Sequence, residues 1–321
     1  MTSNTEAMSN LANMLKINLQ ALYERILRFN NPYYFYGVAN SDYSLKDGII
    51  QLKKLNLELP ELEAVSILRG YPFALKIQDG VGGKFSWENE KVFLRINGLV
   101  FRINSSEEVF IIYEVFVTGV YRYLCARETV FVDIGMNSGV TTLFYAQDPL
   151  VKKIFAFELF KPTFLMGREN LDLNPNYKGK VEAFNYGLSN KTFESTIEYS
   201  ISRKGRMGLK GLPADEQFTD VTREQVTVKN IDLVFEEIIS ASLEQDIVLK
   251  IDCEGEEFNL IESLAKSGQL GNLVVVMIEW HYVRPAEIEN QLSAFDFHIF
   301  SQMLSGLDSG MIYASRRHTK F

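Results

Sequence analysis

The chain has few of the residues that mark several common protein classes. Its only cysteines are Cys125 and Cys253, too few for a disulfide framework, which favours a reducing, cytoplasmic compartment. No early apolar segment approaches the roughly 20 residues that a helix needs to span a bilayer, and residues 1–9 are polar rather than signal-like. A net charge of −8 argues against a nucleic-acid backbone as the main partner, because phosphate binding needs clustered cations.

What the chain does have is enough apolar residue, 46% over 321 positions, to fill one large core with an appendage. Residues 1–83 are predicted to be an N-terminal helical region, with about the first ten residues mobile. Apolar spacing predicts a helix over residues 11–29, and residues 45–55 and 60–68 are interpreted as short helices. These helices could cover an active site or form a homodimer.

The second predicted domain comprises residues 84–321 and follows the glycine-rich junction 79–83. It opens with a β-hairpin at residues 91–103, because two alternating strands flank Asn97-Gly98, the strongest short turn signal. A helix over residues 108–123 is expected to lead into a sheet.

The first motif is a buried strand that runs into a glycine-containing turn. Residues 129–132 are β-branched and aromatic, as in parallel strands covered on both faces, and Asp133, Gly135 and Gly139 follow before an apolar helix start. The glycines allow a tight turn and close approach to a ligand. The pattern D-x-G-x-N-x-G lacks the middle glycine of G-x-G-x-x-G, which disfavours a dinucleotide.

Acidic residues end the following strands as well. Glu158 closes the apolar run 153–157 and follows Gly139 by 19 positions, where an acidic side chain binds a ribose diol in such folds. Asp252 and Glu254 follow the strand 246–251, and Glu279-Trp280-His281 follows 273–278. Because ligands of open α/β sheets bind at the carboxyl ends of strands, these side chains should face one crevice.

These motifs together resemble the FkbM family of S-adenosylmethionine-dependent O-methyltransferases. The resemblance covers about residues 108–300 and rests on the stretches VFVDIGMNSGVTTLFYA, IFAFELFKPTFLMGRENLDLNP, VTVKNIDLVF, VLKIDCEGEEFNLIESL and VVVMIEWH. It implies an α/β class I methyltransferase (Rossmann-like) fold, with a mostly parallel seven-stranded sheet and an antiparallel edge. It also implies methyl transfer (EC 2.1.1.-) to a hydroxyl of a saccharide or secondary metabolite.

The cofactor implied is S-adenosyl-L-methionine. The residues predicted to bind it are Asp133, Gly135, Met136, Asn137, Ser138, Gly139, Glu158, Leu159, Asn185, Tyr186 and Asp252. Two of these have an equally good structural interpretation: Asn137 could stabilise its own turn, and Tyr186 could be a packed loop aromatic.

Methyl transfer to a hydroxyl needs a base near the acceptor oxygen. The candidate catalytic residues are His281, which titrates near neutrality, Glu254 and Asp252. The alternatives are that His281 is a hydrogen-bonded loop residue, that Asp252 orients the methionine end of the cofactor, and that Glu254 caps the next helix. No metal is predicted; a weaker alternative is a magnesium site at Asp252 and Glu279.

Two further features are a buried-strand lysine and a cationic, glycine-containing segment. Lys250 is unusual in an apolar strand and is predicted to pair with a carboxylate such as Asp252. The segment 200–211 carries four cations and three glycines, and is interpreted as a solvated β-hairpin in preference to an acceptor-binding loop.

Two other function classes are alternatives to methyl transfer. The first is an NAD- or nucleotide-sugar-dependent Rossmann enzyme, and the second is a non-catalytic cofactor-binding protein.

Overall fold

The computed structural model describes residues 33, 36–212, 220–242, 244–282, 285–304 and 309–316. The chain divides into two compact units, Met1–Asn97 with Ile103–Tyr113 and Gly98–Arg102 with Glu114–Phe321. The predicted helix over residues 11–29 lies outside the described residues. The predicted domain boundary between residues 83 and 84 stays a proposal.

The first unit contains strands where short helices were expected. Residues 45–55 are not a helix: β1 (Tyr43–Lys46), β2 (Ile49–Leu52) and β3 (Leu57–Pro60) form an antiparallel sheet. Asp47 and Gly48 have φ angles of 52° and 74°, so the chain reverses between β1 and β2. The helix prediction was wrong because it weighted apolar spacing above this Asp-Gly turn signal. Only Val65–Leu68 (α2) is helical within the segment 60–68.

The rest of this unit follows short-range signals. Helix α3 (Tyr71–Val81) runs into the predicted junction and ends at Gly82, whose φ is 70°. Strand β4 (Lys84–Glu88) pairs antiparallel with β5 (Lys91–Ile96). Helix α4 (Ser106–Ile112) begins with a capping box between Ser105 and Glu108. The expected helix over 108–123 is thus shorter, and a π-helical turn (Tyr113–Thr118) follows it.

The predicted hairpin turn is confirmed in its backbone geometry. Asn97 and Gly98 have φ angles of 49° and 81°, as a two-residue hairpin turn requires. Strands β5 and β6 (Leu99–Ile103) lie on either side of this turn.

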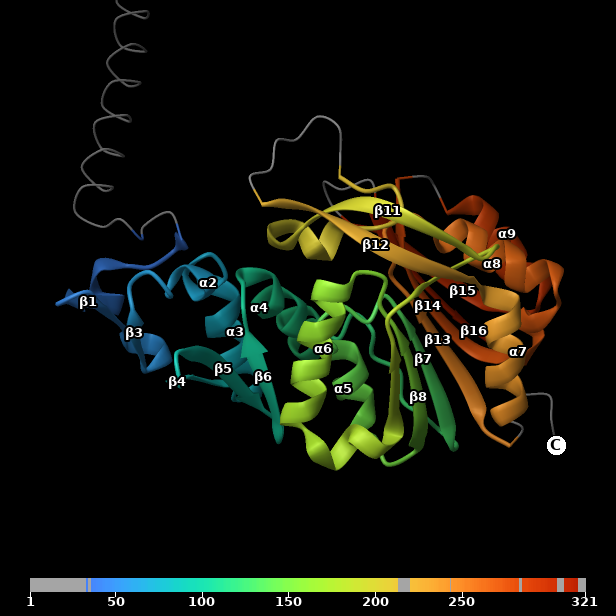
Figure 1. Cartoon of the computed structure of the whole chain (residues 1–321). Coiled ribbons are helices and arrows are strands. Elements are labelled where there is room, and N and C mark those ends of the chain that lie inside the picture. Colours follow the sequence, from blue (N-terminus) through green and yellow to red (C-terminus); the bar gives the residue numbers. More distant parts are fainter. Residues whose placement is uncertain are drawn as a thin grey trace, which may run out of the picture. The chain divides into compact units, whose positions relative to one another are not determined.

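The second unit is built on a seven-stranded sheet of order β15-β16-β14-β13-β7-β8-β9 (Figure 1). The strands are β7 (Thr129–Ile134), β8 (Val151–Phe157), β9 (Val181–Phe184), β13 (Asp246–Ile251), β14 (Leu273–His281), β15 (His298–Met303) and β16 (Ser309–Ser315). From β14 to β9 all pairs are parallel, whereas β16 is antiparallel to both β14 and β15. The predicted fold, a mostly parallel sheet with an antiparallel edge, is confirmed.

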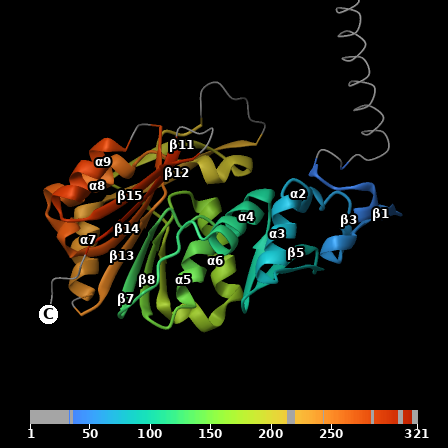
Figure 2. The same ribbon diagram turned by 180° about the vertical axis from the view of Figure 1, so that it is seen from behind.

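Helices cover both faces of this sheet, as Figures 1 and 2 show from opposite sides. One face packs against α5 (Val140–Ala146) and α6 (Lys161–Leu173), the other against α7 (Ile231–Ala241), α8 (Glu257–Lys266) and α9 (Ala286–Ala294). Strand β7 alternates between the two: Val130 and Val132 enter the core with α7, α8 and α9, while Phe131 stacks on Tyr145 of α5 with ring centroids 3.9 Å apart. The continuous apolar runs in the sequence follow from this double cover.

A second, three-stranded sheet of order β10-β12-β11 belongs to the same unit. It comprises β10 (Gly187–Ser189), β11 (Phe193–Ser200) and β12 (Val221–Asn230). Strand β11 leads into a 3-10 helix (Ile201–Arg206). The cationic residues of the segment 200–211 therefore begin directly after β11, in this 3-10 helix.

A buried ion pair lies inside the sheet of the second unit. Lys250 on β13 is 2% exposed, and its Nζ lies 3.1 Å from Oδ1 of Asp133, which is fully buried on the neighbouring strand β7. Nζ also donates to the Gly135 carbonyl at 2.7 Å. Burial alone would lower the pKa of Lys250, but the charges of Asp133 and Asp252 raise it above its ordinary value. The predicted carboxylate partner is confirmed, with Asp133 closer than Asp252, which lies at 3.7 Å.

We expect Lys250→Met to lower the free energy of unfolding by about 3–5 kcal/mol, because it leaves the Asp133 carboxylate buried without its cation. The matched control is Lys153→Met on β8, whose exposed partner is Glu182 and whose loss should cost below about 1 kcal/mol. Urea unfolding of both variants measures the difference. Equal, small losses would contradict a structural role for the buried pair.

Candidate cofactor and active site

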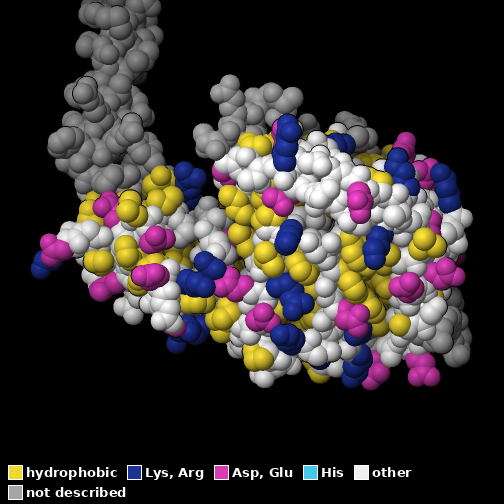
Figure 3. All heavy atoms as spheres, in the orientation of Figure 1, with side chains coloured by type: hydrophobic (Ala, Val, Ile, Leu, Met, Phe, Trp, Pro, Cys, Tyr) yellow, Lys and Arg dark blue, Asp and Glu magenta, His cyan; other side chains and the backbone are white. Residues whose placement is uncertain are grey.

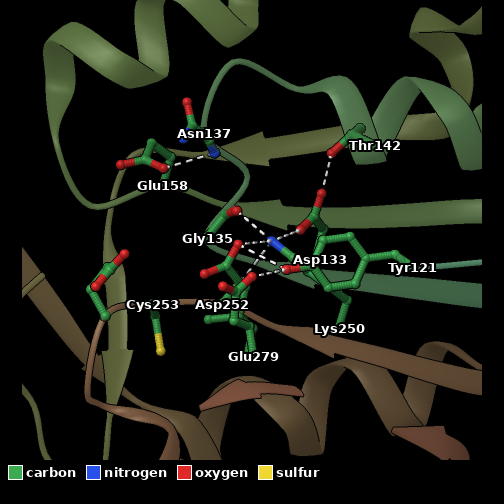
Figure 4. Close-up of polar contacts among 12 residues, drawn as sticks. Tyr121, Asp133, Gly135, Asn137, Thr142, Glu158, Lys250, Asp252, Cys253 and Glu279 are labelled. Carbon is green, nitrogen blue, oxygen red and sulfur yellow. Dashed lines mark hydrogen bonds and ion pairs between the residues drawn. The ribbon is translucent and has the colours of Figure 1, made fainter. Parts of the chain in front are cut away.

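A pocket lies at the carboxyl ends of the central strands, where the sequence predicted one. Its wall is formed by the turns that follow β7, β8 and β13, by the start of β10, and by the segment that follows β11. The lining residues are Ile134, Gly135, Asn137, Phe157, Glu158, Leu159, Gly187, Leu188, Lys204, Gly205, Met207, Gly208, Leu209, Asp252, Cys253, Glu254 and Glu256. Figure 4 shows residues of the turns after β7, β8 and β13, among them Asn137, Glu158 and Asp252, converging from separate strands.

The turn after β7 approaches the turn after β13 very closely. A Cβ atom on Gly135 would lie 1.7 Å from the Asp252 carbonyl oxygen, so only glycine fits. Asn137 lines the pocket with a φ of 52°, and its Oδ1 accepts a 2.7 Å hydrogen bond from Ser138 N. Its side chain therefore stabilises its own turn, which was one of the two interpretations of Asn137 from the sequence.

Other residues of this turn support it from behind. Met136 and Ser138 are buried and do not line the pocket. Gly139 has a φ of 79° and packs on Gly167 of α6, and the Ser138 carbonyl accepts from Asn170. These predicted cofactor residues lie outside the pocket wall.

Asp133 lies below the pocket floor. Its Oδ2 accepts a 2.6 Å hydrogen bond from Thr142 of α5, and Lys250 engages its other oxygen. Figure 4 shows both contacts. Asp133, predicted to bind the cofactor, therefore contacts Thr142 and Lys250 and does not line the pocket.

Glu158 is placed as the sequence predicted. It lines the pocket, and its two carboxylate oxygens accept hydrogen bonds from Asn137 N at 2.9 Å and Phe160 N at 3.0 Å. Burial raises its pKa to about 7, partly offset by those backbone donors. Two fixed oxygens beside an open pocket are suited to accept from a ribose diol.

Leu159, Asn185 and Tyr186, also predicted to bind the cofactor, differ in their positions. Leu159 lines the pocket, whereas Asn185 donates to the Glu158 carbonyl at 3.0 Å and stabilises that loop. Tyr186 packs against Phe157 and Phe184 with Lys229 4.0 Å above its ring, which matches the packed-aromatic interpretation. The next two residues along the chain, Gly187 and Leu188, line the pocket instead.

The three predicted catalytic residues do come together. His281 Nε2 lies 3.6 Å from Glu254 Oε1 and 3.7 Å from Glu279 Oε1, while Nδ1 lies 2.9 Å from Oε1 of Glu257. Asp252 and Glu254 line the pocket. His281 thus lies among four carboxyl groups at the edge of the pocket.

This crowding raises the pKa of several groups. Burial raises the pKa of Glu254 and of Glu279 to about 7, and that of Glu114 to about 8. Burial would lower the pKa of His281, but the hydrogen bond to Glu257 and the Glu254 charge raise it to about 9. At neutral pH His281 is therefore an imidazolium, and Glu254 is partly protonated.

Sequence reasoning missed three residues of this cluster. Glu257 is fully buried at the start of α8 and accepts from Gly255 N as well as holding His281, so it, and not Glu254, satisfies the turn before the helix. It stands inside the quoted CEGEEF run and could have been noticed. Glu114 and Tyr121 come from the segment before β7 and carry no local motif.

The interpretation of residues 200–211 as a solvated hairpin was wrong. Strand β11 ends at Ser200, the chain forms a 3-10 helix, and Lys204, at 4% exposure, joins Met207 and Gly208 in the pocket wall. A Cβ on Gly208 would lie 2.6 Å from the Glu254 carbonyl oxygen, so this loop packs directly on the acidic turn. The cations of this segment suggested a solvent-exposed loop, although the loop packs on the turn that contains Glu254.

The same cluster has a ligand set that a divalent ion accepts. Ligand atoms of Asp252, Glu254 and His281 lie within 4.8 Å of one another, whereas the sequence alternative named Asp252 with Glu279. The absence of a metal stays a prediction.

A family comparison decides the class of protein. The profile of the Methyltransferase FkbM domain matches residues 133–305, more than half of the chain. The chain belongs to the FkbM methyltransferase family. The resemblance seen in the sequence is confirmed, and the protein is an S-adenosylmethionine-dependent methyltransferase. No curated protein matches the chain by sequence.

Solved structures similar to this methyltransferase share little sequence with it. An FkbM methyltransferase from Methylobacillus flagellatus KT is 12% identical over 78% of this chain and 60% of that one, with a TM-score of 0.39. The human methyltransferase 10 domain containing protein is 12% identical over 80% and 96%, with a TM-score of 0.38. A protein of the NADB-Rossmann superfamily from Streptococcus agalactiae is 12% identical over 64% and 68%, with a TM-score of 0.35.

The pocket of this FkbM methyltransferase fits its methyl donor. Gly135 and Asp252 meet backbone to backbone in the pocket wall, Glu158 offers two oriented oxygens, and Asp252 adds a carboxyl group near a ligand that carries a sulfonium and an amino group. When bound, S-adenosylmethionine supplies an electrophilic methyl group.

We expect Glu158→Gln to weaken S-adenosylhomocysteine binding about tenfold to hundredfold, because a hydrogen bond to a charged group contributes about 1.5–3 kcal/mol. A carboxylate accepts from a ribose diol most strongly when ionised and the pKa of Glu158 is about 7, so the gap between wild type and variant should widen from pH 6 to pH 8. Calorimetry measures both. The control is Glu182→Gln on β9, half-exposed and outside the pocket; an equal loss there would refute the assignment.

Proposed function

We propose that this enzyme transfers a methyl group to a hydroxyl of a saccharide or secondary metabolite. The observation that carries the proposal is the placement of a histidine and several carboxyl groups at the edge of the cofactor pocket. Asp252 and Glu254 belong both to the pocket wall and to the cluster around His281. A hydroxyl that reaches the methyl group there lies beside groups able to take its proton.

The proton acceptor is His281 or Glu254, and their protonation states differ. His281, with a pKa of about 9, must first lose its proton to act as a base, whereas Glu254, with a pKa of about 7, is partly ionised at neutral pH. Asp252 is the third candidate and also lies nearest Lys250. Its role in orienting the methionine end of the cofactor remains part of the proposal.

The proposal includes a small acceptor, a cytoplasmic location and an optional homodimer. None of the described helices is long and apolar enough to cross a membrane. Figure 3 shows acidic and basic side chains interspersed around α6, which is an ordinary solvated surface and offers no support for a nucleic-acid partner.

The cofactor and reaction are tested in sequence. Calorimetry should show binding of S-adenosylhomocysteine and none of NAD, which separates the methyltransferase from a dinucleotide enzyme. Isotope transfer from labelled S-adenosylmethionine to a panel of methyl glycosides and polyketide alcohols then tests the acceptor class. Binding without transfer to any hydroxyl, but with transfer to an amine panel, would refute the hydroxyl acceptor.

The pH profile of kcat/KM with an active acceptor should identify the base. A base must be deprotonated, so activity falls as the pH drops through about 7 if Glu254 acts and through about 9 if His281 acts. We expect His281→Gln and Glu254→Gln each to lower kcat, with the larger loss, about 10²–10⁴-fold, for the base. Full kcat in either variant excludes that residue.

A further inference from the structure

Two exposed cations border the pocket on the segment that follows β11. Arg206 and Lys210 are both exposed, and the residues between them, 207–209, line the pocket. The Gly211 N–H donates to the Gly208 carbonyl at 3.0 Å, which closes a tight turn that carries Lys210. Within the part of the chain that the structure describes, neither cation forms an ion pair with a carboxylate. Both charges are therefore available to a ligand.

Tyr282 lies beside these cations, directly after β14. The residue is 54% exposed, and Lys210 Nζ lies 4.7 Å from its ring centroid. Arg206 acts electrostatically on the Tyr282 hydroxyl, which lies 3.3 Å from Oε2 of Glu254 in the pocket wall. The φ of Tyr282 is 68°, a conformation that bulky residues seldom adopt and that is concentrated at ligand-binding and active sites.

Gly255 allows the cation and the ring to meet the acidic turn. A Cβ atom on Gly255 would lie 3.2 Å from Lys210 Nζ and 3.3 Å from Cδ2 and Cε2 of Tyr282. Gly255 directly follows Glu254, one of the two proposed proton acceptors. An acceptor molecule whose hydroxyl reaches Glu254 would therefore extend past Tyr282 and the two cations.

The two cations favour one chemical class of acceptor. A neutral sugar forms no ion pair with them, and an amine would be repelled by them. A carboxylate or phosphate group forms charge-assisted hydrogen bonds with both, and the guanidinium group of Arg206 can bind two of its oxygens at once. A third positive charge, Lys204, lies on the same segment in the pocket wall at 4% exposure.

We propose that Arg206, Lys210 and Tyr282 bind the part of the acceptor that does not react, and that the acceptor is an acidic saccharide. Arg206 and Lys210 bind its carboxylate or phosphate group, and the exposed ring of Tyr282 contacts the apolar surface of the sugar. This inference narrows the acceptor class and rests on the proposed function, because the acceptor hydroxyl must reach Glu254.

Calorimetry on the full chain, with and without saturating S-adenosylhomocysteine, tests the site with three probes. Methyl β-D-glucuronide carries a carboxylate, glucose 6-phosphate carries a phosphate, and methyl β-D-glucoside is neutral. We expect an anionic probe to bind about tenfold more tightly than the neutral one at low salt, and this advantage to shrink at high salt, because exposed ion pairs are screened. The tighter anion identifies the group. Equal affinity for all three probes, or binding of neither anion, overturns the proposal.

The double variant Arg206→Gln with Lys210→Gln removes both charges and changes no pocket-lining residue. Its affinity for the anionic probe should fall about tenfold, to that of methyl β-D-glucoside, while its affinity for S-adenosylhomocysteine stays within about twofold. A matching loss of S-adenosylhomocysteine affinity would mean that the cations bind the carboxylate of the cofactor, and would overturn the proposal.

Lys229→Gln is the matched control for charge. Lys229 is also exposed and lies 4.0 Å from a tyrosine ring centroid, that of Tyr186, but it does not line the pocket. Affinity for the anionic probe should stay within about twofold of wild type in this variant. A loss equal to that of the double variant would mean that only the overall charge of the chain matters, and would overturn the proposal.

The contribution of the ring is measured separately. Tyr282→Ala should weaken all three probes about threefold to tenfold, whereas Tyr282→Phe, which keeps the ring, should retain wild-type affinity. Wild-type affinity in Tyr282→Ala would remove the ring from the site and overturn its assignment.

The results separate this inference from the proposed function. If the wild-type chain binds an anionic probe but not S-adenosylhomocysteine, the proposed function fails and the anion site stands. If it transfers methyl groups to neutral sugars and binds neither anion, the proposed function stands and this inference is overturned.

Discussion

The buried ion pair between Lys250 and Asp133 is the interaction on which the site depends. It joins β7 and β13, the two strands whose ends form the pocket floor, and the same ammonium group also binds the Gly135 carbonyl at the first turn. A buried pair of this kind is costly to desolvate, so its value lies in fixing geometry as well as in stability. The cation places the glycine turn and the acidic turn in contact, with Gly135 against the Asp252 carbonyl.

The second constraint is an excess of carboxyl groups beyond that pair. Asp252, Glu254, Glu279, Glu257 and Glu114 share a small region in which Lys250 and His281 are the nearby cations. Burial disfavours the ionised forms of Glu254, Glu279 and Glu114. This explains why several of these groups have pKa values raised towards or above neutrality. It also makes the region attractive to a positively charged methyl donor.

Short-range signals in the sequence predicted much of this chain correctly. The apolar strand 129–132 with its glycines, the position of Glu158 and the runs around Asp252 and Glu279 predicted the parallel sheet and the edge at which the pocket lies. The prediction failed where two local signals competed, as at residues 45–55, where apolar spacing concealed an Asp-Gly turn. It also failed at Lys204, because charge alone does not tell whether a loop faces solvent or folds back onto another turn.

By itself, the sequence determined the family, the strand-turn-helix units and the acidic residue at each strand end, since these depend on neighbouring positions along the chain. Only the tertiary structure decided which of those acids meet the pocket. Asp133 lies beneath it, paired with Lys250, while Glu158, Asp252 and Glu254 form its wall. Tyr121 and Glu114 enter from a segment with no motif, more than 130 positions before Asp252 and Glu279 in the case of Tyr121. Contacts at such separation arise from packing of whole elements, and local residue patterns do not encode them.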